Sequence, residues 1–409
     1  MKIPYYDQLT PQKTLRLYCD WLLEQQVEDP AFFRIYERGG LMYEWYMVFY
    51  PVRTLMLGGR LLNERKYIDA ALKYVDIYLT EQLPNGAFTS TYRRQPTANL
   101  TREQYHHVMR TGNVNIADNG SNVTAIVLAA EHVDGEKRAK YIEAARKWFD
   151  EFIPIWSLPE GGYNNGKWAG RVSTGPYTCA ISTLVVALSA FGKATGDYYY
   201  VENAESCIKF QCENWFCDDD GRPVNFDSYR PVGDTGGDAR IALEDFGHSF
   251  YLLEGMCWTH SASKNEEIKK LIESKLKIWI HGKRGLLSQW GDSWFNFMVA
   301  AYPWQKGTGD PPTSRQSGIR IGWEMAKSNG IMQCFQYYLN NIDDSPRLRE
   351  KVELGLKYLT APIKCRMSGV MSDPDESYGA FAVQSTGFAG LSVSEAVEKN
   401  SSFSMTKVI

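Results

Sequence analysis

The sequence predicts an all-α protein, an (α/α)6 toroid of six helical hairpins with long loops on one face. Amphipathic helical patterns alternate along the chain with more apolar ones. Each amphipathic pattern is followed by a glycine turn, at Gly40, Gly86, Gly162, Gly221, Gly285 and Gly369. Strand signals, meaning alternating runs of Val, Ile and Thr, are scarce.

An open α-solenoid is the alternative arrangement. A solenoid would have more regular repeats and shorter loops, whereas the turn glycines here are unevenly spaced because the loops differ in length. A closed toroid is therefore expected, with the apolar helices as its inner ring and the amphipathic helices outside. No linker or shift in composition divides the chain, so residues 1–409 are expected to form a single domain.

The helices are expected in alternating order along the chain. In sequence they are Thr10–Gln26, Tyr43–Leu62, Lys66–Leu83, Asn115–Val133, Glu136–Ile153, Tyr177–Gly196, Asp197–Phe216, Asp238–Trp258, Asn265–Ile280, Gly318–Leu339 and Pro346–Thr360, with a last one from near Tyr378. Thr10 is a suitable N-cap because Pro11 follows it in the first helical turn. Pro51 is expected to kink the second helix.

The composition of the chain argues against several classes of protein. The chain has 409 residues, 44% of them hydrophobic, and a formal net charge of −3. The balanced charge and the lack of basic runs argue against nucleic acid as a partner. No apolar run is expected to reach the roughly 18 residues of a membrane span. The N-terminus has no apolar signal core, so a cytoplasmic protein is expected, although a leader could have been removed. The eight cysteines are interpreted as structural thiols.

In a toroid of this kind the N-termini of the inner helices and the long loops form a cup at one end. The positive ends of the helix dipoles favour carboxylates and anionic ligands there. At the start of the second inner helix, Asn115, Asp118 and Asn122 fall within roughly 60° of one another on a helix. We expect Asp118 to face the cup. The alternative is helix capping, which explains one such residue better than three.

The fourth inner helix carries a second polar stripe. At about 100° per residue, Arg240, Glu244, His248 and Tyr251 share one face. The alternative is an exposed face with weak i,i+4 pairs. Glu244 and His248 could also bind a metal ion, but no third ligand has suitable spacing, so no metal or cofactor is expected.

The fifth inner helix repeats this pattern with Arg320, Trp323 and Glu324, and a tryptophan-rich loop containing Trp294 and Trp304 precedes it. Aromatic rings that stack on a sugar, together with Arg near a carboxylate, would suit an acidic sugar. Helix-surface pairing and loop packing are the alternatives. Glu44 and Tyr177, near the starts of the first and third inner helices, are weaker substrate-binding candidates. No phosphate loop, GxSxG elbow or dinucleotide fingerprint is present.

Six hairpins with glycine turns, the acidic helix start ADNGSN and the Trp-rich loops resemble the six-hairpin glycosidase superfamily. The resemblance covers most of the chain and points to unsaturated glucuronyl and rhamnogalacturonyl hydrolases and related β-glucuronidases. In the unsaturated-uronide branch, an Asp at the start of an inner helix protonates the double bond of the sugar, and Asp118 matches that position. The usual second Asp, at the third inner helix, has no counterpart in GPYTCA.

The resemblance therefore implies a glycoside hydrolase that acts on a uronic-acid-containing glycan. Ordinary hydrolysis would use two carboxylates, for which Asp118 and Glu244 are the candidates and Glu324 is the substitute. A polysaccharide lyase with a base at His248 or Tyr251 is one alternative. A sugar epimerase using His106, His107 or His260 is another, and a non-catalytic glycan-binding toroid is a third. A carbohydrate is the expected partner, with neither nucleic acid nor membrane, and homo-oligomerisation is left open.

Overall fold

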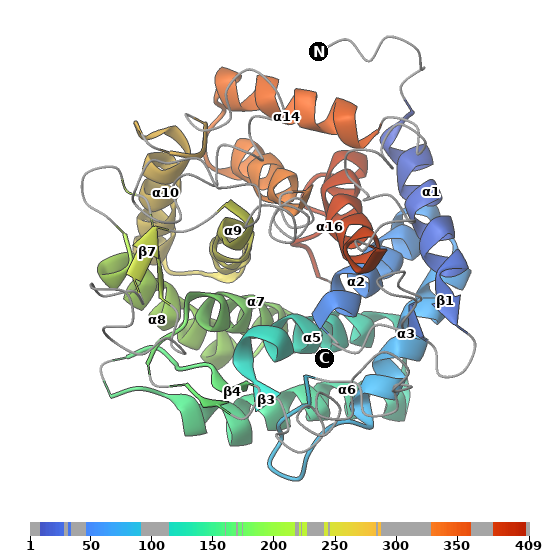
Figure 1. The fold of residues 1–409 in the computed structure, drawn as a ribbon, viewed down its shortest axis with the longest axis horizontal. Helices are drawn as coiled ribbons and strands as arrows, with labels where there is room; N and C mark the ends of the chain where they lie inside the picture. The colour runs from blue at the N-terminus through green and yellow to red at the C-terminus, as the bar shows by residue number, and fades with distance from the viewer. Residues whose placement is uncertain are drawn as a thin grey trace.

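The computed structural model describes residues 9–27, 32–33, 46–90, 114–159, 161–168, 171–173, 175–216, 221, 223–226, 241–243, 246–283, 285–287, 329–360 and 379–405. Its helices form an outer layer around an inner ring (Figure 1). The inner helices are α2 (Tyr46–Leu62), α5 (Ile116–Ala129), α7 (Thr178–Thr195), α9 (Phe246–Ala262), a helical segment at residues 329–341 and α16 (Gly379–Val397). The outer helices are α1 (Pro11–Glu24), α3 (Arg65–Leu79), α6 (Gly135–Lys147), α8 (Tyr198–Asn214), α10 (Glu266–His281) and α14 (Pro346–Leu359).

The inner ring is closed. Helices α2, α5, α7 and α9 pack against one another in chain order, and α16 packs against α2. The hydroxyl of Thr54 in α2 donates to the carbonyl of Gly387 in α16 over 2.6 Å. A side chain at Gly387 would collide with the backbone nitrogen of Pro51, so glycine allows the two helices to approach closely. The predicted all-α toroid is confirmed, and the open solenoid is excluded.

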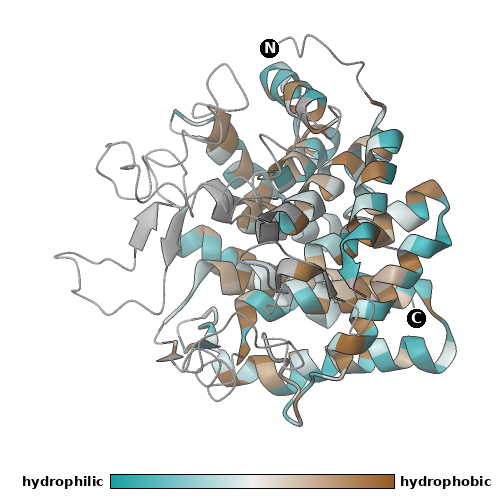
Figure 2. Cartoon of the chain, turned by 45° about the vertical axis from the view of Figure 1, so that its right-hand side comes forward, coloured by the Kyte–Doolittle hydropathy of each residue, from teal (hydrophilic) through white to brown (hydrophobic). Residues whose placement is uncertain are grey.

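The layers differ in polarity as the sequence predicts. Hydrophilic and hydrophobic residues occur along the same outer helix (Figure 2). The inner helix α7, by contrast, is long and apolar enough to cross a membrane by length and composition, which corrects the expectation that no apolar run reaches that length. Because 89% of its 18-residue window is buried, α7 is interpreted as a core helix that packs against α5, α8 and α9.

Several of the predicted helix starts are confirmed by capping contacts. Thr10 is the N-cap of α1, where its hydroxyl accepts from the backbone N–H of Lys13 over 3.2 Å. Asn265 caps α10 in the same way. Pro51 lies inside α2. The helix predicted to run to Ile153 instead ends at Lys147 and continues as a π-helical turn, Trp148–Phe152, and a 3-10 turn, Ile153–Trp156. Pro154 lacks a backbone N–H and is suited to such a change.

One predicted helix start is wrong. The helix expected from Asp238 begins at Phe246, because residues Ile241–Leu243 form strand β7, which pairs antiparallel with β6 (Val224–Phe226). Inter-strand hydrogen bonds across this short hairpin satisfy the backbone in place of a helical turn. The predicted stripe therefore does not run along one helix, because β7 lies within its span. Arg240 and Glu244 themselves lie outside the described residues.

The other described strands are equally short. They are β1 (Gln26–Val27) with β2 (Phe32–Phe33), and a three-stranded sheet of β3 (Val114–Asn115), β4 (Gly166–Trp168) and β5 (Arg171–Val172), all antiparallel. The second of these sheets joins the start of α5 to the loop that precedes α7. It therefore positions part of the candidate site.

The C-terminal segment closes one end of the ring. The guanidinium of Arg60, near the end of α2, donates to the carbonyl of Ser401 over 2.8 Å, and the ammonium of Lys193, near the end of α7, donates to that of Phe403 over 2.6 Å. The ring of Phe403 packs against Trp258 of α9 and Tyr337. Since this segment meets the C-terminal ends of the inner helices, their N-termini lie together at the opposite end.

Candidate active site

The start of α5 is built by three asparagine-mediated contacts. The N-cap Asn115 accepts from the backbone N–H of Asp118 through its side-chain oxygen over 2.9 Å. Asn165 accepts from the N–H of Ile116 through its carbonyl, over 3.0 Å, and from that of Ala117 through its side-chain oxygen, over 2.9 Å. The first N–H groups of a helix are the ones that bind anions. Here these N–H groups already donate to Asn115 and Asn165. They are therefore not free to bind the anionic ligand that was expected at the start of α5.

The sheet of β3, β4 and β5 holds Asn165 in place. Asn115 of β3 lies opposite Gly166 of β4. Gly166 has a positive φ of 85°, and a side chain there would approach the carbonyl of Val114 to 2.7 Å. Asn165 is buried, and its own N–H donates to the hydroxyl of Ser173 over 2.9 Å. The loop before α7 is therefore attached to the start of α5.

Asp118 is the carboxylate that this assembly presents. It is half-buried, and its Oδ2 accepts from the Nδ2 of Asn115 over 2.7 Å. Burial raises the pKa of Asp118 to about 7, while hydrogen bonds from Asn115 and Ser90 act in the opposite direction. A carboxyl group with this pKa carries a proton in a large fraction of molecules at neutral pH. Asp118 can therefore act as an acid.

Asn122, a predicted substrate-binding residue, points elsewhere. It is completely buried, and its Nδ2 donates to the hydroxyl of Tyr78 in the outer helix α3 over 2.8 Å. That hydroxyl in turn donates to the Oδ1 of Asn119 over 2.8 Å. The three-residue stripe predicted for α5 therefore divides: Asn115 caps the helix, Asp118 stays accessible, and Asn122 supports the helix from behind. Assigning Asn122 to the wall of the cup was wrong because the shared stripe extends into the packed α3–α5 interface.

A buried ion pair that the sequence did not reveal lies in the interior of the ring. Arg53 of α2 pairs with Glu254 of α9 at 2.5 Å, and both side chains are 1% exposed. The hydroxyl of Tyr50 donates to Glu254 over 3.3 Å and lies 3.3 Å from the hydroxyl of Ser121 in α5. Gln333 donates to the same carboxylate over 3.4 Å. This network joins four inner helices, and its burial makes Glu254 unsuitable as a group that contacts substrate.

Two predicted aromatic residues lie at the end of the ring where the inner helices start. Tyr251, in the second turn of α9, is 8% exposed, and its ring centroid is 6.2 Å from that of Tyr50. Tyr177 directly precedes α7 and is half-buried. The backbone of His248 lies in the first turn of α9. The structure thus brings the helix starts that carry Asp118, Tyr177 and His248 to one end of the molecule.

The other predicted site residues fall outside the described part of the chain. They are Glu44, Arg240, Glu244, Trp294, Trp304, Arg320, Trp323 and Glu324, as well as the epimerase candidates His106 and His107. Within the described ranges, no group of three or more His, Cys, Asp or Glu side chains gathers to hold a metal ion.

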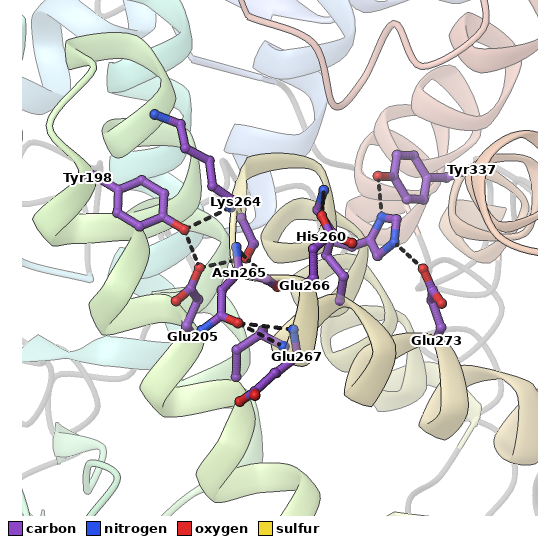
Figure 3. A network of polar contacts seen from close by, with 12 residues as sticks. Tyr198, Glu205, His260, Lys264, Asn265, Glu266, Glu267, Glu273 and Tyr337 are labelled. Carbon is purple, nitrogen blue, oxygen red and sulfur yellow. Dashed lines mark hydrogen bonds and ion pairs between the residues drawn. The ribbon is translucent and has the colours of Figure 1, made fainter.

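His260 lies at the opposite end from the start of α5. Its Nδ1 is 2.9 Å from the hydroxyl of Tyr337, and its Nε2 is 3.2 Å from the carboxylate of Glu273 (Figure 3). Both ring nitrogens are therefore engaged near the C-terminal end of α9. This position separates His260 from Asp118 and from the cup.

Comparison with known proteins identifies the fold. No protein-family model matches the sequence, and a search of curated proteins finds no match. Among solved structures, a glycoside hydrolase family 76 mannosidase from Bacteroides thetaiotaomicron is similar with a TM-score of 0.60 and 12% identity, over 95% of this chain and 98% of that one. A sugar epimerase from a ruminal bacterium gives 0.58 and 12%, over 84% and 85% of the two chains.

A polysaccharide lyase is similar with a TM-score of 0.55 and 10% identity, over 95% of this chain and 98% of that one. Identities this low concern the fold and leave the reaction to be argued from the site. The predicted six-hairpin fold is thereby confirmed, whereas the resemblance to unsaturated glucuronyl hydrolases is only indirect, because the similar structures are mannosidases, epimerases and a lyase. The chain has the six-hairpin (α/α)6 fold that these similar structures share.

Proposed function

We propose that this protein is a carbohydrate-active enzyme, and specifically a glycoside hydrolase in which Asp118 is the general acid. One observation carries the proposal: Asp118 lies at the start of the inner helix α5, is only partly buried and has a pKa of about 7. Glycoside hydrolysis requires a carboxylic acid that protonates the leaving-group oxygen, and a raised pKa keeps that acid protonated at neutral pH.

The second carboxylate of the reaction is proposed to come from Glu244, with Glu324 as the substitute. Glu254 does not fill this role, because it is buried and neutralised by Arg53. The distance between the two carboxyl groups determines whether the anomeric configuration is retained or inverted. The stereochemistry of the product would therefore report that distance.

The proposed substrate is a uronic-acid-containing glycan. Support for a carbohydrate comes from the similar solved structures, whose names include a mannosidase, a sugar epimerase and a polysaccharide lyase. The proposal that the sugar is acidic depends on Arg240 and Arg320, which would pair with a sugar carboxylate. A neutral sugar is therefore the comparison substrate in any test.

The reaction class depends on which group gives or removes a proton. A lyase or an epimerase begins by removing a proton from carbon and needs a base at that step. We assign Asp118 the role of proton donor, which its raised pKa permits. A lyase base at Tyr251 is disfavoured, because that side chain is 8% exposed and packs against Tyr50 and Phe250.

The test is activity on aryl β-glucuronide, unsaturated uronide disaccharides, uronate polymers and neutral manno-oligosaccharides, with reducing ends, near-ultraviolet absorbance and sugar isomers followed together. Hydrolysis that is lost in Asp118→Asn and Glu244→Gln would support the proposal. The matched control is Asp69→Asn, since Asp69 is an exposed residue of the outer helix α3. Rising absorbance on a polymer would replace the hydrolase with a lyase, and isomerisation without bond cleavage would replace it with an epimerase.

A further inference from the structure

We propose that Asn115 is a positioning residue for Asp118, which holds its carboxyl group in one orientation and selects the oxygen that carries the proton. This inference rests on the proposed role of Asp118 as an acid. Asn115 does not itself need to contact substrate, and it is completely buried. It would act through Asp118 alone.

Asn115 uses both ends of its amide, unlike an ordinary N-cap. A cap needs only a side-chain oxygen that accepts from the helix, and Asn115 provides it to the backbone N–H of Asp118. Its Nδ2 also donates to the Oδ2 of Asp118 over 2.7 Å and to the hydroxyl of Ser90 over 3.0 Å. In a capping box, the third residue of the helix would bond to the backbone N–H of the cap. Here it bonds to the side chain of the cap.

This arrangement distinguishes the two oxygens of Asp118. A protonated carboxyl group has one O–H donor and one acceptor oxygen. Because Oδ2 accepts the N–H of Asn115, it is held as an acceptor oxygen, and we assign the proton to Oδ1; the hydroxyl of Ser90 is the other donor to this carboxyl group. Fixing the proton on one oxygen of a restrained side chain would favour transfer along a single direction.

The same contact limits the pKa of Asp118. An N–H that donates to a carboxylate stabilises its charged form and so opposes the effect of burial. Among the described residues, Tyr78 and Glu81 of the adjoining hairpin are the titratable groups near the start of α5. Burial raises the pKa of Tyr78, which keeps it neutral, and Glu81 accepts a hydrogen bond from Thr89 over 2.9 Å. Removing the Asn115 donor should therefore raise the pKa of Asp118.

Two substitutions separate this role from capping. Asn115→Ser keeps an N-cap oxygen and removes the amide donor. Asn115→Asp also keeps the cap, but it places a second carboxylate against Asp118. Asn265 is a matched control, because it caps α10 through its side-chain oxygen, which accepts from Glu267 and Ile268 (Figure 3). Asn265→Ser and Asn265→Asp change an equivalent cap at the other end of the molecule.

The experiment follows the titration of Asp118 by carbon NMR of the carboxyl groups, with the signal assigned from Asp118→Asn. We expect an upward shift of about one pH unit or more in Asn115→Asp, where the pair titrates in two steps, and a smaller upward shift in Asn115→Ser. The Asn265 variants should leave the titration of Asp118 unchanged. An unshifted titration in a folded Asn115→Asp variant would overturn the proposal.

Activity on the substrate found for the wild-type enzyme supplies the second measurement. The Asn115 variants should lower kcat at least tenfold with little change in KM, and their alkaline limb should move with the NMR titration. Equal losses in the Asn265 variants would show a general effect of capping and overturn the positioning role. If the wild type turns over no carbohydrate while the titration still shifts in the Asn115 variants, the proposed function fails and the control of Asp118 by Asn115 stands.

Discussion

Arg53 and Glu254 form an ion pair across the ring, between the first and the fourth inner helices, with 2.5 Å between the guanidinium nitrogen and the carboxylate oxygen. Residues on opposite members of a six-membered ring reach one another only through its interior. Tyr50, Ser121 and Gln333 bond to the pair or to each other around it. The network therefore ties together helices that carry the candidate site at their starts.

Glu254→Gln should destabilise the protein by about 3–5 kcal/mol, because it leaves the buried guanidinium of Arg53 without a counter-charge. Unfolding in urea at neutral pH measures the loss. Glu213→Gln is the control, since Glu213 pairs with Lys209 on the surface of α8 and both side chains are more than half exposed. That substitution should cost under about 1 kcal/mol. Similar losses in both variants would contradict a special role for the buried pair.

Asp118→Asn should lower kcat at least about a hundredfold, the usual contribution of a general acid. In the wild type, activity should fall as pH rises through about 7, because the raised pKa of Asp118 marks the loss of its proton. A pH–rate profile of the substrate found above measures both effects. If the residual activity of Asp118→Asn still falls as pH rises through about 7, the alkaline limb of the pH–rate profile belongs to a group other than Asp118.

The raised pKa of Asp118 should also make the stability of the fold depend on pH. The pKa of Asp118 is raised from 3.8 to about 7 in the folded state, so folding favours the protonated form. Its stabilising contribution is complete below about pH 4 and is lost as pH rises through 7. Asp118→Asn should remove this dependence and gain stability relative to the wild type at pH 8. Thermal unfolding of both proteins at pH 5 and pH 8 tests this, and an equal pH dependence would contradict it.

The sequence predicted the fold well because its signals are local. Helical periodicity, glycine turns and caps such as Thr10 and Asn265 depend on residues a few positions apart, and the helices form as expected. Asp118 could be predicted as a candidate for the same reason, since an acidic residue at the start of an apolar helix is a local pattern. The one misplaced helix start, at Asp238, arose because a helical stripe was extended through residues that pair with β6 instead.

The partners of the site were not predictable in this way. Asn165 lies 50 positions after Asn115 in the chain, and the β3–β4 pairing brings the two segments together. The ion pair of Arg53 and Glu254 is separated by 201 positions. Each is the single Arg, Lys, Asp or Glu in an apolar stretch, but its partner can be identified only once the ring has closed. Ring closure is therefore the step that forms this buried network.

The packing of the C-terminal segment against the inner helices should contribute to the stability of the fold and should not affect the pKa of Asp118. Phe403 is 1% exposed, and its ring centroid lies 4.7 Å from that of Tyr337 and 5.8 Å from that of Trp258. Phe403→Ala should cost about 3–5 kcal/mol, as expected for a buried aromatic truncated to alanine. Urea unfolding gives the cost, and the titration of Asp118 should stay where it is. A shifted titration would show that the two ends of the toroid are coupled.

The close contact between α2 and α16 should leave no room for a side chain at position 387. At Gly387, an added Cβ would collide with the backbone nitrogen of Pro51, which cannot turn aside as a flexible side chain would. Gly387→Ala should therefore force the first and last inner helices apart and lower the free energy of unfolding by about 1–3 kcal/mol, the range for overpacking. Gly175→Ala is the control, because nothing lies within 4 Å of its Cβ position and its backbone does not have a positive φ. Urea unfolding of the two variants measures the difference. A neutral Gly387→Ala would mean that the ring closes more loosely than the Thr54–Gly387 hydrogen bond implies, whereas a loss confined to Gly387 identifies this contact as the one that closes the toroid.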